Sequence, residues 1–152
     1  MKNKYFTPDI EDICIGYEYE QLVTPLSESL DKGEEEWMKC KFPDPFTIDR
    51  ILLLYERKEQ LRVPYLTKEQ IEAEGWTYKT RSTDLWFERK EIFLREDGNH
   101  LENIKLQYGL HDYRLKISFV YVGDSEESTN AYLGECKDIN TFRLIQKLLG
   151  IK

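Results

Sequence analysis

The chain contains few of the residues on which catalytic and metal sites are usually built. Its 152 residues include two histidines and three cysteines, Cys14, Cys40 and Cys136, and none of the cysteines belongs to a CxxC pair. A zinc site needs four Cys or His ligands, or three and a water, with close-spaced pairs. We therefore expect no metal site and a buried, reduced thiol at each cysteine.

The two histidines lie beside predicted turns. His100 follows the turn signal Asp97-Gly98, and His111 lies in the turn expected at residues 109–112. Histidines in such places are usually solvated, and a nucleophilic triad needs a His beside a Ser or Cys and an acid. No glycine-rich phosphate-binding loop is present in the sequence. We therefore predict no catalytic residue and no cofactor.

Long apolar runs and an excess of positive charge are also missing. The longest aliphatic run covers residues 51–54, and residues 1–8 contain no apolar run. These segments predict neither a membrane span nor a signal peptide. The net charge of −7 disfavours nonspecific phosphate binding. We expect a soluble cytoplasmic protein with no membrane partner, and the charge disfavours a nucleic-acid partner.

The chain does have the material for a hydrophobic core. Hydrophobic residues make up 40% of it and aromatic residues 13%. A length of 152 residues corresponds to one domain, so we predict a single domain over residues 1–152. Charged residues, at 34%, exceed the usual share of about 25%, which indicates a well solvated surface.

Alternating apolar and polar residues predict several β-strands. The expected strands are Ile13–Glu20, Trp37–Phe42, Leu61–Tyr65, Trp76–Thr80, Leu85–Glu88, Glu91–Arg95, Ile104–Tyr108, Tyr113–Tyr121 and Asn130–Cys136. The fifth and sixth could also be one strand with a bulge near Lys90. Because Pro64 has no N–H to donate, its strand should lie at an edge or end there. Asp97-Gly98 is a hairpin turn signal.

A short helix near residues 68–74 has the clearest signals in the chain. Thr67 and Gln70 are spaced for a capping box, and Leu66 and Ile71 for a hydrophobic staple. Gly75 can end the helix in the left-handed conformation, which lets Trp76 fold back onto Ile71. We therefore predict one cluster of Leu66, Ile71 and Trp76.

A C-terminal helix is expected near residues 139–149. Asp138 is its predicted cap, and Phe142, Ile145 and Leu149 form its apolar stripe. Gly150 should end it and Ile151 should pack back on Ile145. This helix is the candidate to cover the apolar end of the Tyr113–Tyr121 strand at Val120 and Val122.

Residues 47–57 are ambiguous between a helix and a buried strand, and their length favours the helix. The sum is an α+β fold, mainly an antiparallel sheet of several strands with two or three helices.

Two groups of residues are candidates for function. Glu18 and Glu20 share a strand face about 6.8 Å apart, a spacing at which two carboxylates could perform hydrolysis. A solvent-facing strand face, on which alternating acids are common, is the favoured explanation. The second group, which could bind single-stranded nucleic acid, is Trp86, Phe87, Arg89, Lys90 and Phe93. Glu88 and Glu91 neutralise that patch.

Three segments resemble a family of small uncharacterised proteins encoded by gut anaerobic bacteria and the phages that infect them. The segments are Tyr5–Ile13 with Gly16-Tyr17-Glu18, Arg62–Trp76, and Asp138–Arg143 with Leu148–Ile151. Together they cover about a third of the chain, and the segments between them have no match. The family has no assigned activity, so no functional residue carries over. The resemblance implies a phage or mobile-element setting.

The sequence therefore favours a small non-enzymatic binding or protein-interaction module, phage-encoded and acting on a host component. Such a module should lack a deep polar pocket and show an apolar or acidic surface patch. The alternatives are a carboxylate-based hydrolytic enzyme and a structural or oligomer-forming phage component. The sequence names no binding residue and leaves the partner and the oligomeric state open.

Overall fold

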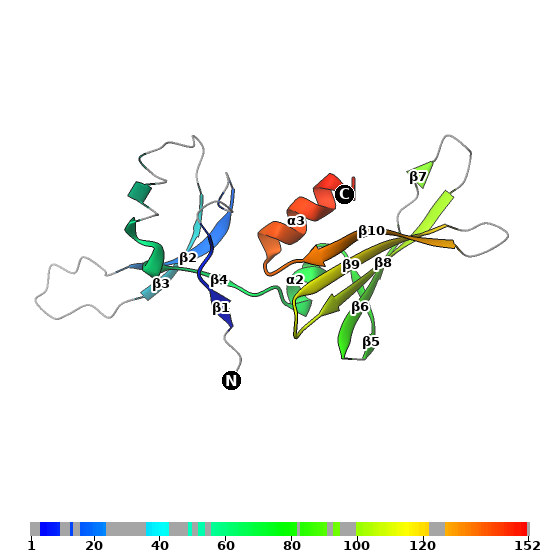
Figure 1. Ribbon diagram of the computed structural model, residues 1–152, viewed down its shortest axis with the longest axis horizontal. Coiled ribbons are helices and arrows are strands. Elements are labelled where there is room, and N and C mark those ends of the chain that lie inside the picture. The colour runs from blue at the N-terminus through cyan, green and yellow to red at the C-terminus, as the bar shows by residue number, and fades with distance from the viewer. Residues whose placement is uncertain are drawn as a thin grey trace, which may run out of the picture. The chain divides into compact units, whose positions relative to one another are not determined.

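The computed structural model describes residues 4–9, 13, 16–23, 36–42, 49, 52–53, 56–81, 83–90, 93–94, 100–121 and 127–151. The chain divides into two compact units, Met1–Tyr65 and Leu66–Lys152. Each unit contains an antiparallel sheet (Figure 1), so the predicted α+β class is confirmed. The single domain over residues 1–152 stays a prediction.

The first unit contains a four-stranded sheet in the order β1-β4-β2-β3. Its strands are β1 (Tyr5–Phe6), β2 (Glu18–Val23), β3 (Glu36–Lys41) and β4 (Leu61–Pro64), and the 3-10 helix η2 (Lys58–Gln60) precedes β4. The buried residues of its core are Ile13, Tyr17, Tyr19, Phe42, Leu61 and Val63.

Two predictions for this sheet need correction. The strand expected at Ile13–Glu20 begins at Glu18, because Gly16 has a φ of +84°, which interrupts extended backbone. The strand also continues to Val23. β4 ends at Pro64 as predicted, but it lies between β1 and β2 and not at an edge.

The second unit contains a sheet in the order β10-β9-β8-β6-β5, with β7 paired to β8. The strands are β5 (Thr77–Arg81), β6 (Asp84–Arg89), β7 (Phe93–Leu94), β8 (His100–Gly109), β9 (Arg114–Tyr121) and β10 (Glu127–Glu135). β6 and β7 are separate strands, as in the first of the two predictions, and not one strand with a bulge near Lys90. The turn predicted at Asp97-Gly98 lies outside the described residues, although the β7–β8 pairing on either side of it is antiparallel.

The helix α2 (Lys68–Ala73) has the predicted capping box. The Gln70 backbone N–H donates to Thr67 Oγ1 at 3.2 Å, and the Thr67 N–H donates to Gln70 Oε1 at 2.9 Å. Gly75 has a φ of +89°, the left-handed conformation that ends the helix. Leu66, Ile71 and Trp76 are buried in one hydrophobic cluster, which confirms the predicted grouping.

The helix α3 (Ile139–Leu148) begins at Asp138, whose carboxylate accepts from the N–H groups of Asn140 and Thr141. It ends in a Schellman motif. The Ile151 N–H donates to Gln146 O at 2.9 Å and the Gly150 N–H donates to Lys147 O at 3.1 Å. The carbonyls of Gln146 and Lys147 near the end of the helix therefore have partners inside the chain.

The core of the second unit lies between the helices and one face of the sheet. Its cluster joins Ile71 of α2, Phe142 and Ile145 of α3, and Leu115 and Ile117 of β9. Val120 is buried but is not a member, and alternation directs it to the opposite face. The predicted covering of Val120 by α3 is therefore not confirmed, and Val122 lies outside the described residues.

A buried hydrogen bond connects the two helical segments of this core. The indole N–H of Trp76, which follows α2, donates to Gln146 Oε1 of α3 at 2.8 Å. Both side chains are almost fully buried, at 2% and 6% exposure. A buried indole N–H without an acceptor is costly, so this bond fixes α3 to the end of α2.

The described residues between 47 and 56 are helical, and Arg57 lies in a turn. Asp49, Leu52, Leu53 and Glu56 are in helical conformation, and the Arg57 N–H donates to Leu53 O at 3.1 Å. This supports the helix over the buried strand. The bounds of the helix lie outside the described residues.

The Trp76–Gln146 bond leads to a stability prediction. Gln146→Leu keeps the side-chain volume but leaves the Trp76 N–H without an acceptor, so it should lower the free energy of unfolding by about 1–3 kcal/mol. Leu144→Ala on the exposed side of α3 is the control and should cost less than about 0.5 kcal/mol. Urea unfolding followed by circular dichroism measures both, and equal losses would contradict the role given to the bond.

Candidate functional site

The carboxylates Glu18 and Glu20 lie in cross-strand ion pairs and not in a shared acidic site. Glu20 stands opposite Arg62 and accepts from its Nε at 2.7 Å. Glu18 stands opposite Lys41, with 4.0 Å between Oε1 and Nζ. Each carboxylate therefore has its own cation, an arrangement that stabilises strand pairing and leaves no acid–base pair.

Arg62 lies between two aromatic rings. Its guanidinium carbon is 3.9 Å from the ring centroids of Tyr5 and of Trp37, which belong to β1 and β3. The planar guanidinium stacks on the rings while it binds Glu20. Arg62 therefore links all four strands of the first sheet.

The two glutamates should differ when they are replaced. Glu20→Gln weakens a half-buried ion pair with Arg62 and should lower stability by about 1–2 kcal/mol. Glu18→Gln removes an exposed, 4.0 Å pair and should cost less than about 0.5 kcal/mol. The Trp37 indole resonance in urea, measured by NMR, reports on the first unit. A larger effect at Glu18 would overturn this ranking.

The thiols and the buried phenol are poorly suited to nucleophilic chemistry. The predicted burial is confirmed at Cys136. Cys40 is only half-buried, and Cys14 lies outside the described residues. Burial raises the pKa of both described thiols, and Asp138 raises that of Cys136 further. Burial likewise raises the pKa of Tyr108. These groups stay neutral near pH 7.

The pKa shifts and burial predict the order in which the thiols react. Cys40 should be alkylated by iodoacetamide well before Cys136, because only Cys40 is partly accessible. Peptide mass spectrometry at timed intervals measures the order. The protein in guanidinium chloride is the control, in which the two should react at similar rates. Faster modification of Cys136 in the native protein would contradict its burial.

The other candidates named from the sequence do not gather. His111 is exposed in the turn after β8, and His100 is the first residue of β8. Trp86 and Phe87 are neighbours on β6 and therefore face opposite sides of the sheet, with Phe87 in the core. Trp86 and Phe87 therefore do not share one surface, and the side chain of Phe93 lies outside what the structure describes.

The sheet of the second unit has one face on which no helix among the described residues of that unit packs. We call it the helix-free face. Pairing aligns Trp86 of β6, Gln107 of β8, Lys116 of β9 and Leu133 of β10 in one row across it. The next row contains Glu88, Lys105, Ser118 and Asn130. These residues alternate along their strands with the core residues, which explains why they share a face.

A hollow of about 250 Å³ lies on this face. Its lining residues are Trp86, Lys105, Gln107, Lys116, Ser118 and Ser128. Gln107 donates to Asp84 at 2.6 Å and Ser118 donates to Asn130 at 3.1 Å, so the polar side chains are held in place. Lys116 has no ion-pair partner among the residues that the structure describes. The hollow combines a cation, an aromatic ring and oriented polar groups.

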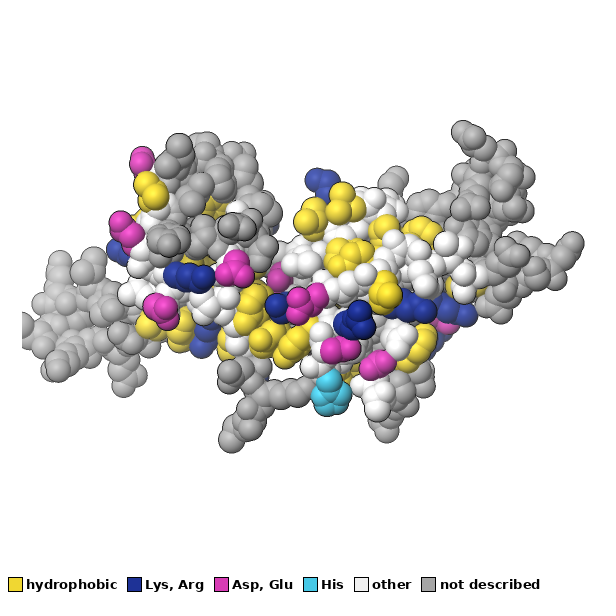
Figure 2. All heavy atoms as spheres, in the orientation of Figure 1, with side chains coloured by type: hydrophobic (Ala, Val, Ile, Leu, Met, Phe, Trp, Pro, Cys, Tyr) yellow, Lys and Arg dark blue, Asp and Glu magenta, His cyan; other side chains and the backbone are white. Residues whose placement is uncertain are grey.

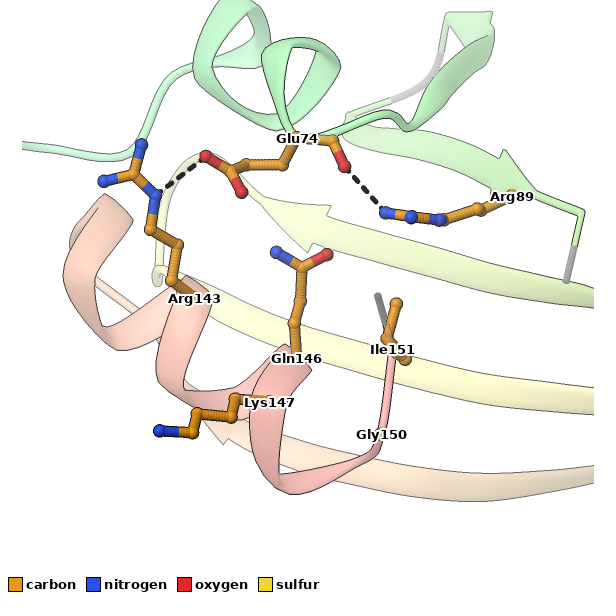
Figure 3. Close-up of a pocket in the computed structure, with 7 residues that line it drawn as sticks. All are labelled: Glu74, Arg89, Arg143, Gln146, Lys147, Gly150 and Ile151. Atoms are coloured by element: carbon orange, nitrogen blue, oxygen red, sulfur yellow. Dashed lines mark hydrogen bonds and ion pairs between the residues drawn. The ribbon is translucent and has the colours of Figure 1, made fainter.

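A second hollow, of about 360 Å³, lies at the C-terminal end of α3 (Figure 3). Its lining residues are Glu74, Arg89, Arg143, Gln146, Lys147, Gly150 and Ile151. Glu74 holds two of the cations: its Oε1 accepts from Arg143 Nε and its backbone O accepts from Arg89 Nη1, each at 2.7 Å. The lining therefore contains three cationic side chains and one carboxylate, and only Arg143 binds that carboxylate.

Hydrophobic side chains also lie on the outer surface over α3 (Figure 2), where Leu144 and Leu148 are exposed at 55% and 76%. They are one helical turn apart on the side that faces away from the core.

Sequence reasoning missed both hollows. Lys105, Gln107 and Lys116 carried a usable signal, because they occupy the polar positions of two strands whose apolar positions were recognised. Their alignment with Trp86 and Leu133 depends on register and on a bulge between Asn130 and Tyr132. Gln146 carried no signal, because a glutamine on a helix reads as an ordinary surface residue.

Among the described residues, no three His, Cys, Asp or Glu side chains gather into a possible metal site, and no helix is long and apolar enough to cross a membrane. Comparisons with family models, with curated proteins and with solved structures find no match.

Proposed function

We propose that the protein is a small non-enzymatic binding module whose helix-free face binds a partner protein. The observation that carries the proposal is the row Trp86–Gln107–Lys116–Leu133, with the hollow beside it. Trp is among the commonest residues that dominate binding energy at interfaces. Leu133 is 59% exposed at the other end of the row, so both ends offer apolar area to a partner.

The charge of this face indicates the kind of partner. Lys105 and Lys116 line the hollow, whereas the whole chain has a net charge of −7. The cationic hollow attracts an acidic segment, while the negative charge of the rest of the protein repels it. The two effects together favour one orientation of the partner. The partner should therefore present an acidic side chain flanked by apolar residues. The sequence predicted an apolar or acidic patch, and this face is apolar at its ends and cationic between them.

The surroundings of the carboxylates, thiols and phenol that a hydrolytic enzyme could use also support this proposal. Glu18 and Glu20 each face a cation, and the described thiols and the Tyr108 phenol stay neutral. We extend the proposal to a phage-related setting and a host partner, on the resemblance of the three sequence segments alone.

A peptide-display selection tests the proposal. A random twelve-residue library selected on the immobilised protein should enrich acidic sequences with apolar neighbours. Lys116→Glu should weaken the selected peptides about tenfold or more, because it replaces attraction by repulsion. Trp86→Ala should weaken them similarly.

Leu144→Gln on α3 is the matched control and should leave affinity unchanged. The proposal fails if selected peptides bind both sheet-face variants as tightly as the original protein. It also fails if size measurement shows that a second copy of the chain covers this face and that Lys116→Glu dissociates it, which would favour an oligomer-forming component.

A further inference from the structure

We propose that the hollow at the C-terminal end of α3 is a binding site for a carboxylate group. It is separate from the helix-free face and does not depend on the proposed function. Gln146 is only 6% exposed, yet it lines the hollow.

The orientation of the Gln146 amide follows from its partner. Trp76 Nε1 is a donor only, so the atom of Gln146 that lies 2.8 Å from it must be the oxygen. The nitrogen, Nε2, therefore occupies the other side of the amide plane. A flipped amide would place two donors against each other.

Nε2 donates to no other group among the described residues, although Gln146 is nine-tenths buried. Figure 3 shows the amide standing between Arg143 and Ile151, on the side of α3 that faces Glu74 and Arg89. Among the described residues, the buried side-chain atoms without a hydrogen-bond partner are Asn103 Oδ1 and Tyr108 Oη, so Gln146 Nε2 is open to the hollow and can donate to an acceptor there. The hollow is where that acceptor can lie.

The opposite wall contributes positive charge in a fixed position. Arg89 donates to Glu74 O at 2.7 Å, and its guanidinium lies over Gly75, where a Cβ would be 3.3 Å from Nη1. Arg143 is held by Glu74 Oε1. Lys147 points away from Gln146 in Figure 3, so it adds charge and not a fixed donor. The lining thus favours an anion that accepts hydrogen bonds.

The negative ends of two helices adjoin the hollow, but their carbonyls already have donors. Glu74 O accepts from Arg89, and the Schellman bonds occupy Gln146 O and Lys147 O. Their repulsion of an anion is therefore reduced. The carboxylate of Glu74 remains and penalises a dianion more than a monoanion. A carboxylate fits this balance better than a phosphate.

NMR titration tests the site with acetate as the probe. At constant ionic strength, acetate replacing chloride should shift the Gln146 side-chain NH2 and the Trp76 indole N–H in a saturable way. The Trp37 indole, which belongs to the first unit, is the internal control and should stay constant. A second titration uses a blocked Gly-Asp-Gly peptide, whose only carboxylate is a side chain. Tighter binding of this peptide than of acetate would indicate a peptide ligand, and tighter binding of acetate a free small acid.

Arg89→Gln should weaken acetate about tenfold, the effect of one charge-assisted hydrogen bond. Lys79→Gln, which removes a lysine outside the hollow, should change it little. Linear, non-saturating shifts that chloride reproduces would overturn the proposal, and so would tighter binding of phosphate than of acetate.

Gln146→Glu tests the carboxylate site independently if Arg89→Gln does not fold. It preserves an acceptor for Trp76 and places a carboxylate in the hollow itself. The variant should keep the melting temperature of the original protein and no longer respond to acetate. A melting temperature lower than that of Gln146→Leu would show that the hollow rejects a carboxylate.

Discussion

The hydrogen bond from Trp76 to Gln146 is the interaction on which the second unit depends most. It joins residues 70 positions apart and lies in the core. The apolar cluster supplies most of the stabilisation, but area burial is nondirectional and would allow α3 several positions on the sheet. A single buried donor with a single acceptor selects one of them. The hollow at the C-terminal end of α3 is lined by the same Gln146 that makes this bond.

This position of α3 also determines what the other face of the sheet can do. Both α2 and α3 contribute to the same cluster with Phe87, Leu106 and Leu115. Alternation then directs Trp86, Gln107 and Lys116 to the side where no described helix of this unit packs. The chemistry of the helix-free face is therefore a consequence of how the core is filled. Lys116 has no ion-pair partner among the described residues and is therefore available to a partner, whereas Glu88 on the same face is paired with Lys79 at 3.2 Å.

Local signals in the sequence predicted the local structure well. The capping box at Thr67, the left-handed Gly75 and the Leu66–Ile71–Trp76 cluster depend on residues close in the chain, so spacing alone suffices. The interior place of β4, between β1 and β2, depends on partners far away in the sequence. The rows of the helix-free face require exact pairing across four strands, and the role of Gln146 requires knowing that it meets Trp76. Such long-range pairings leave no periodic trace.

The distribution of charge is the strongest support for the binding function proposed above. Catalysis by side chains needs a group whose protonation changes near neutral pH, and such groups arise where burial and a neighbouring charge act together. In the described residues those effects act on Cys136 and Tyr108, and they raise both pKa values away from neutrality. Lysine and arginine side chains line the hollow of the helix-free face and the hollow at the end of α3. On a chain of net charge −7 they are local exceptions, and a fixed local charge of opposite sign is what orients an acidic partner before contact.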